Sequence, residues 1–458
     1  MTKFDVIVIG AGVVGCAVAR HFTLEGARVL TIEKASDLLD GASKGNSAIL
    51  HTGFDAPSGT LEQQCVVDGY QSYMDIHESL GLSVHRIGAL VIAWTDTDED
   101  ALNGILKKAH TNGIHDAHLV SAANIAKREP SLSKAAKAGI SIPGESIIDP
   151  WTSPYLYQLQ AIENGATLIR NCEVFGGEFN GTEWSLETNR GVFSGASVIN
   201  CAGLYGDILD QRLIQKSAFK IHPRKGQFLI YDKSANPLLN SIILPVPNET
   251  TKGIVICPTV FGNVLVGPTA EPQSSRDDAS VNTEVLQQLQ EKGNQIVPDL
   301  QNHTITATYA GIRPATEHQD YSIENQSEKN YISVGGIRST GLSAALGIAK
   351  YVFDLHTSVR KPYTSLKSPT WPTANSIDEK KERDWQKADN RGVVCHCEWV
   401  TRREIQQALE GPLPVASLAG LKRRTRATMG RCQGFYCTSK LVDMTEGYFN
   451  EPLSSSKA

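Results

Sequence analysis

The sequence predicts a mixed fold, part α/β and part α+β, for three reasons. A strand, a glycine-rich turn, a helix and a second strand follow one another at the N-terminus, as in a parallel nucleotide-binding sheet. The middle of the chain holds apolar runs bounded by turn residues, which are typical of a separate antiparallel sheet. Four of the nine cysteines lie close to the C-terminus, which indicates a small third unit.

The N-terminal unit begins with a strand expected at residues 5–9, a short apolar and β-branched run of the kind that is buried on both faces. Gly10, Gly12 and Gly15 then form the pattern G-x-G-x-x-G at the turn into a helix expected at residues 13–24. These glycines allow a tight turn, a close approach of the backbone to a pyrophosphate, and close packing of helix on strand. The free N–H groups and the dipole at the start of the helix favour a bound anion.

A second strand, expected at residues 28–32, completes this unit and ends in Glu33. The Glu33 carboxylate can accept a hydrogen bond from a ribose hydroxyl. A glycine motif alone is weak, but strand, turn, helix, strand and acid in this order predict a Rossmann-like dinucleotide-binding domain. The alternative is an ordinary βαβ unit whose glycines serve packing only.

The remaining elements are predicted from hydrophobic spacing and turn residues. Helices are expected at residues 61–80, 98–112, 121–129, 153–164, 281–296 and 342–355. Strands are expected at residues 86–94, 167–173, 184–188, 221–232, 253–268, 304–313 and 331–335, with a hairpin at 139–148 and a strand that runs from residue 198 into a glycine turn. Residues 357–377 are rich in Ser, Thr, Pro and Lys and predict a linker, and the charged residues 379–389 predict a solvated helix face.

Length and composition limit the possible functions. The chain has 458 residues, which favours two or three domains. Its formal net charge of -5 gives no sign of nucleic-acid binding. No apolar run approaches the ~20 residues that cross a bilayer, and no signal peptide is evident. We therefore expect a cytoplasmic protein and leave open a peripheral position at the inner face of the membrane. Five cysteines are scattered and are expected to be buried thiols, namely Cys16, Cys65, Cys172, Cys201 and Cys257.

Six further motifs follow the glycine motif in a characteristic order: NSAILHTGFDAPSGTL, VINCAGLYGD, PRKGQFLIYD, PTVFGNVLVGPTAE, YAGIRP and GGIRSTGLSAALGIA. Over about residues 3–360 the chain resembles the D-amino-acid-oxidase-type FAD-dependent oxidoreductases. The branch that it resembles most contains glycerol-3-phosphate dehydrogenase and L-2-hydroxyglutarate dehydrogenase. The resemblance implies a Rossmann-like FAD-binding domain assembled from discontinuous segments, with a mostly antiparallel substrate domain covering the flavin.

The resemblance also implies domain boundaries. The FAD-binding domain would comprise residues 1–80, 149–215 and 330–360, and the substrate domain residues 81–148 and 216–329. A linker at residues 361–390 would lead to a small cluster-binding domain with four cysteines at residues 391–450.

The same resemblance implies which residues hold FAD. Its ADP half would be held by Gly10, Gly12, Gly15, Glu33 and the adjacent Lys34, with Ala202 and Gly203 on the adenine side. Ser43, Asn46 and Ser47 would lie near the pyrophosphate or the isoalloxazine ring, and the turn of Ser339, Thr340, Gly341 and Leu342 would lie beside that ring. A helix beginning at this turn would place positive potential near the part of the ring that is negative after reduction.

The clustered cysteines form the pattern C-x-C…C-x4-C, with Cys395, Cys397, Cys432 and Cys437. Four thiolates suit zinc or an iron–sulfur cluster. The spacing resembles the bacterioferritin-associated-ferredoxin-like [2Fe-2S] module appended to some flavoprotein dehydrogenases, with zinc or an empty site as alternatives. Short helices are expected at residues 401–409 and 413–418, and His396 is not expected to be a ligand. Cations before the second pair would stabilise an anionic cluster, namely Lys422, Arg423, Arg424, Arg426 and Arg431.

His51 is the expected general base, because the resemblance places its small-residue loop beside the flavin and imidazole is a suitable base near neutral pH. A structural histidine is the alternative. Arg313, in the motif GIRP, is expected to bind a carboxylate or phosphate through two parallel hydrogen bonds. Arg338 is the second candidate, with flavin packing or a salt bridge as its alternative, and Lys225 is the third. Because the aerobic glycerol-3-phosphate dehydrogenases carry Lys where this chain has Arg338, specificity for a phosphate stays open.

The predicted reaction is oxidation of the secondary alcohol of a small anionic substrate by hydride transfer to flavin N5. The substrate would be glycerol 3-phosphate or a 2-hydroxy acid such as 2-hydroxyglutarate. Electrons would leave through the [2Fe-2S] cluster to a partner subunit or a quinone, which favours a dehydrogenase over an oxidase. The alternatives are a non-catalytic electron-transfer protein, an FAD-dependent amino-acid, imino-acid or opine dehydrogenase and, as the weakest, NAD binding at the glycine motif.

Overall fold

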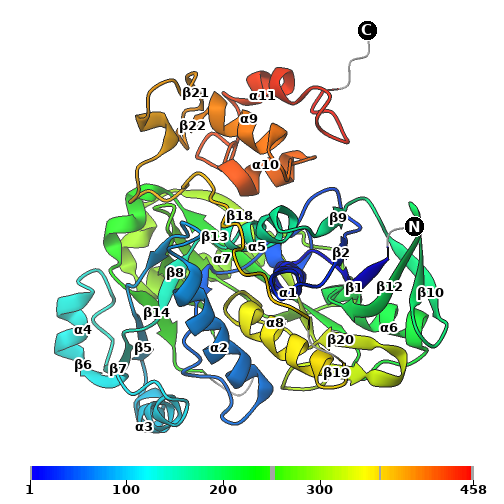
Figure 1. The fold of residues 1–458 in the computed structure, drawn as a ribbon. Coiled ribbons are helices and arrows are strands. Elements are labelled where there is room, and N and C mark those ends of the chain that lie inside the picture. The colour runs from blue at the N-terminus through cyan, green and yellow to red at the C-terminus, as the bar shows by residue number, and fades with distance from the viewer. Residues whose placement is uncertain (1–2, 248–252, 361–362, 455–458) are drawn as a thin grey trace.

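Two large sheets dominate the structure, a computed structural model that describes residues 3–247, 253–360 and 363–454. The chain passes between the two sheets several times before it forms a small C-terminal unit, drawn in orange and red in Figure 1. This architecture confirms the predicted combination of α/β and α+β classes. The exact domain limits stay a prediction.

The first sheet is parallel in its centre. Its strands run in the order β9 (Thr167–Ile169), β2 (Val29–Ile32), β1 (Phe4–Ile9), β12 (Gly191–Asn200) and β20 (Tyr331–Gly335), with β19 (Ser322–Gln326) antiparallel at the edge. The first half of β12 pairs with β11 (Trp184–Thr188), which forms an antiparallel hairpin with β10 (Val174–Phe179). Val6 and Val8 face one apolar cluster, whereas Ile7 and Ile9 face another. Both faces of β1 are therefore buried, which is why the strand is apolar at nearly every position.

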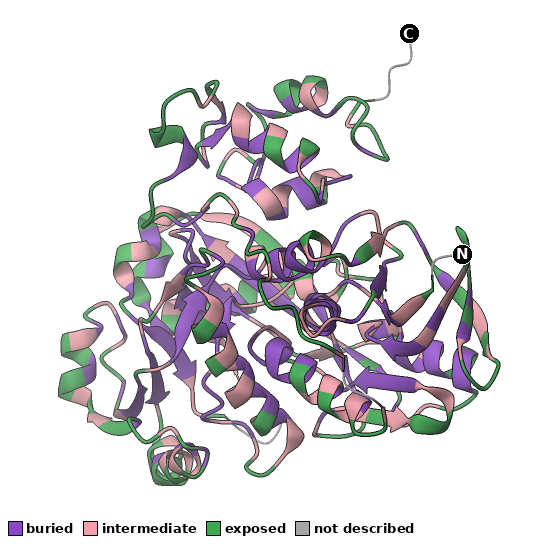
Figure 2. Ribbon diagram, in the orientation of Figure 1, coloured by how far each residue is buried: buried purple, intermediate pink, exposed green. Residues whose placement is uncertain are grey.

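Helices cover both faces of this sheet (Figures 1 and 2). One face is covered by α1 (Val13–Leu24), α2 (Leu61–Ile76), α5 (Thr152–Glu163) and α8 (Gly341–Thr357), and the other by α6 (Gly206–Ile214). Glycines bring α2 and α8 into backbone contact. A Cβ on Gly69 would lie 2.2 Å from the backbone carbonyl oxygen of Ser343, and a Cβ on Gly347 would lie 2.2 Å from that of Cys65. The start of α8 is thereby fixed against the body of the protein.

The second sheet is mostly antiparallel, as predicted for a substrate domain. Its strands run in the order β17 (Glu271–Pro272), β13 (His222–Tyr231), β16 (Val264–Gly267), β15 (Val255–Pro258), β14 (Ile242–Pro245), β5 (Ala89–Ala93), β7 (Ala138–Ile142) and β6 (His118–Ser121). The long strand β18 (Ile305–Ala315) also pairs with β13. Among the described strands of this second sheet, only β14 and β5 pair in parallel. The helices of this part are α3 (Asp96–Thr111), α4 (Ala122–Arg128) and α7 (Thr283–Ile296).

The predicted hairpin at residues 139–148 was wrong. β7 pairs with β5 and β6 in the second sheet, whereas β8 (Ser146–Ile148) pairs with β3 (Ile49–Leu50) and β4 (Val84–His85) in a small third sheet. The Pro143-Gly144 turn therefore carries the chain from one sheet to another. This crossing places the intervening Glu145 in the interior, where it is fully buried.

The C-terminal unit has its own apolar core. It consists of a hairpin of β21 (Val393–Cys395) and β22 (Val400–Thr401) and the helices α9 (Arg402–Glu410), α10 (Leu418–Thr425) and α11 (Thr438–Thr445). The helix expected at residues 413–418 was wrong, because α10 begins where it was expected to end. The charged residues 379–389 were expected to form a solvated helix face, and most of them are exposed, but they contain only a short 3-10 turn at Asp384–Gln386. Arg383 and Asp384 are buried there, and Asp384 accepts hydrogen bonds from Arg403.

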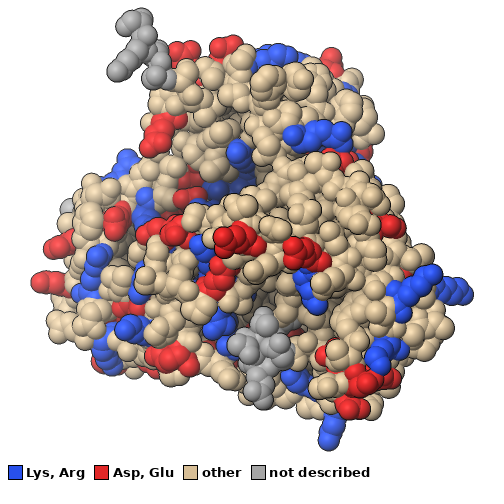
Figure 3. Space-filling view, turned by 180° about the vertical axis from the view of Figure 1, so that it is seen from behind, with Lys and Arg blue, Asp and Glu red and all other residues tan. Residues whose placement is uncertain are grey.

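Two surface properties agree with the composition. None of the described helices is long and apolar enough to cross a lipid bilayer. On the face shown in Figure 3, acidic and basic side chains are interspersed rather than gathered into one basic patch.

Candidate functional site

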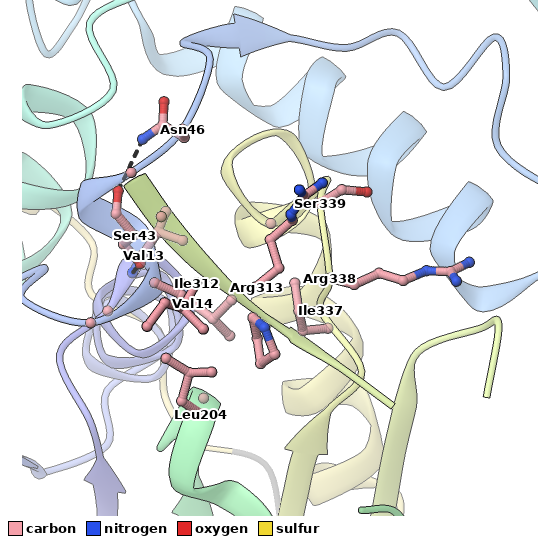
Figure 4. Close-up of a pocket in the computed structure, with 18 of the residues that line it drawn as sticks. Val13, Val14, Ser43, Asn46, Leu204, Ile312, Arg313, Ile337, Arg338 and Ser339 are labelled. Carbon is pink, nitrogen blue, oxygen red and sulfur yellow. Dashed lines mark hydrogen bonds between the residues drawn. The ribbon is translucent and has the colours of Figure 1, made fainter. Parts of the chain in front are cut away.

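A cavity of about 840 Å³ lies between the two large sheets (Figure 4). Its lining includes the predicted cofactor residues Gly10, Gly12, Glu33, Lys34, Ser43, Asn46, Ser47, Ala202, Gly203, Ser339, Thr340, Gly341 and Leu342. It also includes three of the predicted catalytic residues, His51, Arg313 and Arg338. The structure thus brings into one cavity segments that are hundreds of residues apart in the sequence. Gly15 and Lys225 are not part of the lining.

The glycine turn fits a pyrophosphate for steric reasons. Gly10 has a φ of +103°, and a Cβ there would lie 2.5 Å from the Cys201 oxygen. A Cβ on Gly15 would lie 1.9 Å from the Gly10 oxygen, so this glycine serves the packing of α1 on the turn. Gly12 caps α1 without a side-chain hydrogen bond, and the N–H of Val13 donates to Ser43 Oγ at 3.0 Å. The start of a helix with exposed N–H groups therefore faces the cavity, as an anion site requires.

Glu33 lies at the end of β2 and is held by the backbone. Its carboxylate accepts hydrogen bonds from the N–H groups of Ala11 at 2.7 Å and Ala35 at 2.8 Å. Burial raises the pKa of Glu33, and these two backbone N–H groups oppose that shift. A carboxylate offers about four lone-pair sites. The remaining capacity suits a ribose hydroxyl, so the residues present fit the ADP half of FAD.

His51 forms a buried dyad with a residue that sequence reasoning missed. Its Nδ1 lies 2.8 Å from Glu145 Oε2, and the other carboxylate oxygen accepts from the N–H and the hydroxyl of Thr52. The Glu145 side chain has no exposed surface, whereas that of His51 is 23% exposed. A neutral imidazole that donates from Nδ1 carries its lone pair on Nε2. The signal in the sequence was an acidic residue in an otherwise apolar strand–turn–strand segment.

Arg313 lies opposite a second arginine that sequence reasoning also missed. β13 and β18 pair so that Arg224 faces Arg313, and both line the cavity. Burial, together with the Arg224 charge, lowers the pKa of Arg313 to about 10. Neither guanidinium forms an ion pair with any residue in the described ranges, and Arg313 instead donates to the Thr269 oxygen. Like charges opposite each other are destabilising, so this pair favours a bound anion.

Strand alternation explains why Lys225 is not in the lining. Arg224, Gly226 and Phe228 face the cavity, and Lys225 between them points to the other side of β13. A Cβ on Gly226 would lie 2.6 Å from Arg313 Nη2, so this glycine makes room for the guanidinium. Arg224 therefore takes the place that was expected for Lys225.

Arg338 lines the cavity but is held by other groups. Its Nη2 lies 3.9 Å from the buried carboxylate of Glu62 and donates to the Gln319 oxygen. Figure 4 shows its side chain extending away from the strand that carries Arg313. Glu62 in turn accepts a hydrogen bond from Thr340 Oγ1 at 2.8 Å. The salt bridge weighed as the alternative for Arg338 is thus present, and Arg313 is better placed to bind an anion.

The four clustered cysteines lie in two pairs, Cys395 with Cys437 and Cys397 with Cys432. Cys395 and Cys437 are buried, and the other two are partly exposed. The backbone N–H groups of residues 434–436 lie near the sulfur of Cys432 and help to lower the pKa of its thiol. Among the described residues no three His, Cys, Asp or Glu side chains meet at one metal position. Two thiol pairs with backbone N–H groups beside them fit a [2Fe-2S] cluster, in which each iron takes two thiolates.

The basic residues beside the cysteines bind the body of the protein instead of surrounding the cluster. Arg423 donates to the Leu38 oxygen at 2.9 Å, and the Arg424 guanidinium lies 3.2 Å from the centre of the Tyr155 ring. Arg426 is buried between Glu398 and Phe261, and Arg431 contacts Asp232. The expectation that these cations serve the cluster was therefore incomplete. Their main contacts fix the C-terminal unit on the loop after β2 and on the second sheet.

Comparisons with known proteins agree with this geometry. Residues 5–355 match the family model described as FAD dependent oxidoreductase, and residues 393–446 match the BFD-like [2Fe-2S] binding domain. The chain is 31% identical to a glycerol 3-phosphate dehydrogenase of Caloramator mitchellensis, over 96% of this chain and 93% of that protein. It is 24% identical to one subunit of the anaerobic glycerol-3-phosphate dehydrogenase of Escherichia coli, over 97% of this chain and 88% of that protein.

A solved structure shows the same fold over most of the chain. The FAD-bound L-α-glycerophosphate oxidase of Mycoplasma pneumoniae superposes with a TM-score of 0.77 at 25% identity, covering 82% of this chain and all of that one. A protein of this fold thus holds FAD. Both cofactor predictions, FAD and a [2Fe-2S] cluster, are thereby confirmed, whereas the individual site residues stay predictions.

Proposed function

The chain belongs to the FAD-dependent oxidoreductase family, in its glycerol-3-phosphate dehydrogenase type, and from this premise we propose that it oxidises the secondary alcohol of glycerol 3-phosphate. The observation that carries the proposal is the Arg224–Arg313 pair in the same cavity as the His51–Glu145 dyad. One pair binds an anionic group and the other removes a proton. A small hydroxylated anion is the substrate class that needs both.

The arginine pair favours a doubly charged group. Two guanidiniums that face each other across a strand pair, with no carboxylate ion-paired to them in the described segments, gain most from a dianion. A phosphate monoester carries close to two negative charges at neutral pH. The planar forks of Arg224 and Arg313 can each donate two hydrogen bonds to it.

The His51–Glu145 dyad would prepare the hydroxyl for oxidation. Glu145 orients the imidazole through Nδ1, so that Nε2 accepts the hydroxyl proton and the buried carboxylate stabilises the resulting imidazolium. FAD, held at the glycine turn and at Glu33, supplies the hydride acceptor, and the [2Fe-2S] cluster supplies a one-electron outlet.

A second candidate substrate is a 2-hydroxy acid such as 2-hydroxyglutarate. Its distal carboxylate could bind Arg313 through two parallel hydrogen bonds, and Arg338 would lie near a second anionic group. An L-2-hydroxyglutarate dehydrogenase from Arabidopsis thaliana is 25% identical to this chain, over 76% of this chain and 83% of that protein. The arginine pair favours the phosphate over this alternative, because a single carboxylate balances only one of the two charges.

The electron acceptor is proposed to be a second protein or a quinone. A cluster with two partly exposed cysteine ligands offers electrons near the surface. The relative from Escherichia coli is named as one subunit of its enzyme, which supports a partner protein here.

The proposal is tested by mixing the purified yellow protein, without oxygen, with single candidate substrates and recording the flavin absorption. We expect glycerol 3-phosphate to bleach the flavin quickly, and 2-hydroxyglutarate to do so slowly or not at all. Rapid bleaching by 2-hydroxyglutarate but not by glycerol 3-phosphate would identify the 2-hydroxy acid as the substrate. Bleaching only by amino or imino acids, or by none of these compounds, would contradict the proposed reaction.

A further inference from the structure

Thr428 is a buried residue beside the four cysteines that the proposed reaction does not use. It lies between α10 and Cys432, and 5% of its surface is exposed. Its hydroxyl is inaccessible to solvent and has no hydrogen-bond partner in the part of the chain that the structure describes. Buried hydroxyls in proteins nearly always have a partner, so this one calls for an explanation.

The backbone at Thr428 is held in an unusual conformation. Its φ is +69°, a left-handed value that is rare for a β-branched residue. Such conformations persist where the surrounding structure fixes them, and they gather at functional sites. Here the neighbour is Gly434 in the loop between Cys432 and Cys437. A Cβ on Gly434 would lie 3.1 Å from Thr428 Cβ and 3.2 Å from its methyl group.

The same segment contacts both cysteine pairs. The backbone N–H of Thr428 lies near the sulfur of Cys437. Two residues later, a Cβ on Gly430 would lie 2.3 Å from the Cβ of Cys397. The backbone from residue 428 to residue 430 thus runs along the edge of the space that the two thiol pairs enclose.

Covalent geometry then limits where the hydroxyl can lie. In threonine the hydroxyl oxygen is three bonds from the backbone nitrogen, a separation of about 3 Å. Because that nitrogen lies near Cys437 and the Thr428 side chain packs on Gly434 in the Cys432–Cys437 loop, the Thr428 hydroxyl lies close to the cluster ligands. A hydroxyl hydrogen rotates freely to reach an acceptor. The described protein atoms offer no acceptor to this hydroxyl, whereas a [2Fe-2S] cluster held by these four cysteines would supply sulfur atoms as acceptors.

We propose that the Thr428 hydroxyl donates a hydrogen bond to sulfur of the [2Fe-2S] cluster and thereby raises its reduction potential. A donor stabilises the reduced cluster more than the oxidised one, because the reduced form carries one more negative charge. The reaction concerned is the uptake of a single electron by the cluster, and no bond to Thr428 is made or broken.

The test compares Thr428→Val, which keeps the shape and removes the hydroxyl, with Thr428→Ser, which keeps the hydroxyl. The cluster potential of each holoenzyme is titrated with redox dyes and chemical reductant, and the reduced cluster is recorded by electron paramagnetic resonance. At a fixed solution potential we expect about a tenfold lower reduced-to-oxidised ratio for Thr428→Val, which corresponds to ~59 mV for a one-electron couple. Thr428→Ser should restore the ratio of the parent protein. No substrate is added, so the result is independent of the substrate proposed above.

Thr425→Val is the matched control. Thr425 is equally buried and lies in the same unit, but its hydroxyl already donates to the Leu421 oxygen at 2.8 Å. Its loss should lower thermal stability and leave the cluster potential unchanged. A Thr428→Val protein with a full cluster and the potential of the parent would overturn the proposal.

Thr428→Gly covers the case in which Thr428→Val does not incorporate the cluster. Glycine adopts the left-handed backbone without strain, so a loaded protein with a lowered potential supports the hydroxyl role. A loaded Thr428→Gly protein with the parent potential contradicts it. Loss of the cluster in the Val and Gly variants, with full loading in Thr428→Ser, also supports a bond from the hydroxyl. Loss in all three variants would show that Thr428 serves folding alone.

Discussion

The two ends of the central cavity are built in different ways. The FAD end consists mainly of backbone, with a turn, a helix start and one carboxylate that all lie between Gly10 and Glu33. The end at which we propose that the substrate binds consists of side chains, with His51 and its partner Glu145, Arg224 and Arg313 contributed by four distant segments. A group that many proteins share can be bound by a local backbone motif. A particular substrate needs side chains that only the assembled fold brings together.

Replacing the proposed base should have the largest effect at the substrate end. His51→Ala removes the group that accepts the hydroxyl proton, so flavin reduction by glycerol 3-phosphate should slow by about 10²–10⁴-fold. Substrate binding should change little, because the arginine pair remains. Stopped-flow absorption gives both the limiting rate and the apparent dissociation constant. An unchanged reduction rate in a fully flavinated variant would assign His51 a structural role.

Glu145→Gln should approach the effect of removing His51, although Glu145 is not expected to touch the substrate. The Glu145 oxygen that faces Thr52 accepts two hydrogen bonds, so the glutamine oxygen would take that place and its NH₂ would face His51. The imidazole would then carry its proton on Nε2 and could not act as a base. A wrong tautomer of this kind lowers the rate by up to about 10⁴-fold in a serine protease. Thr52→Val keeps the carboxylate and is the control, with a much smaller loss expected.

Arg313→Ala should weaken substrate binding by about 10²-fold or more in KM, since truncating a buried charge pair costs about 2–5 kcal/mol. Arg338→Ala, in which the lost guanidinium was already held by Glu62 and Gln319, should raise KM far less. Steady-state kinetics of both variants measures the difference. An equal response of the two variants would contradict the assignment of the anion to Arg313.

Substitutions at the FAD end should change thermal stability and FAD retention rather than KM. In Gly15→Ala the new methyl group would meet the Gly10 oxygen, and overpacking of this kind costs about 1–3 kcal/mol. In Gly12→Ala the nearest atom is Ser43 Oγ at 3.2 Å, so the cost should be smaller. Thermal stability should therefore fall most in Gly15→Ala, whereas retained FAD should fall in both variants, because Gly12 lines the cofactor cavity; the KM of the flavinated fraction should stay unchanged. A rise in KM without loss of FAD would break the distinction between the two ends.

The sequence predicted the local elements beside the cavity well, because their signals are short. The strand β1, the turn and α1 follow from apolar runs and glycine spacing, and these features depend on neighbouring residues only. The order of motifs identified the family, and the cysteine spacing identified the cluster type. The element limits were less accurate where the chain changes sheets, as at β7 and β8, because pairing partners there are distant in sequence.

What only the tertiary structure decided is which charged side chains meet. Lys225 and Arg224 are adjacent in the sequence, and the pleat of β13 turns one of them into the cavity and the other away from it. Glu145 is the partner of His51 because the chain crosses between sheets beside it. Arg338 instead lies against Glu62 on α2, which makes it a weaker candidate for binding an anion than Arg313. Residue types and short spacings can be read directly from the sequence, and they determine the strand–glycine turn–helix motif of β1 and α1. Side-chain direction across a strand and contact between distant segments arise only when the sheets pack together.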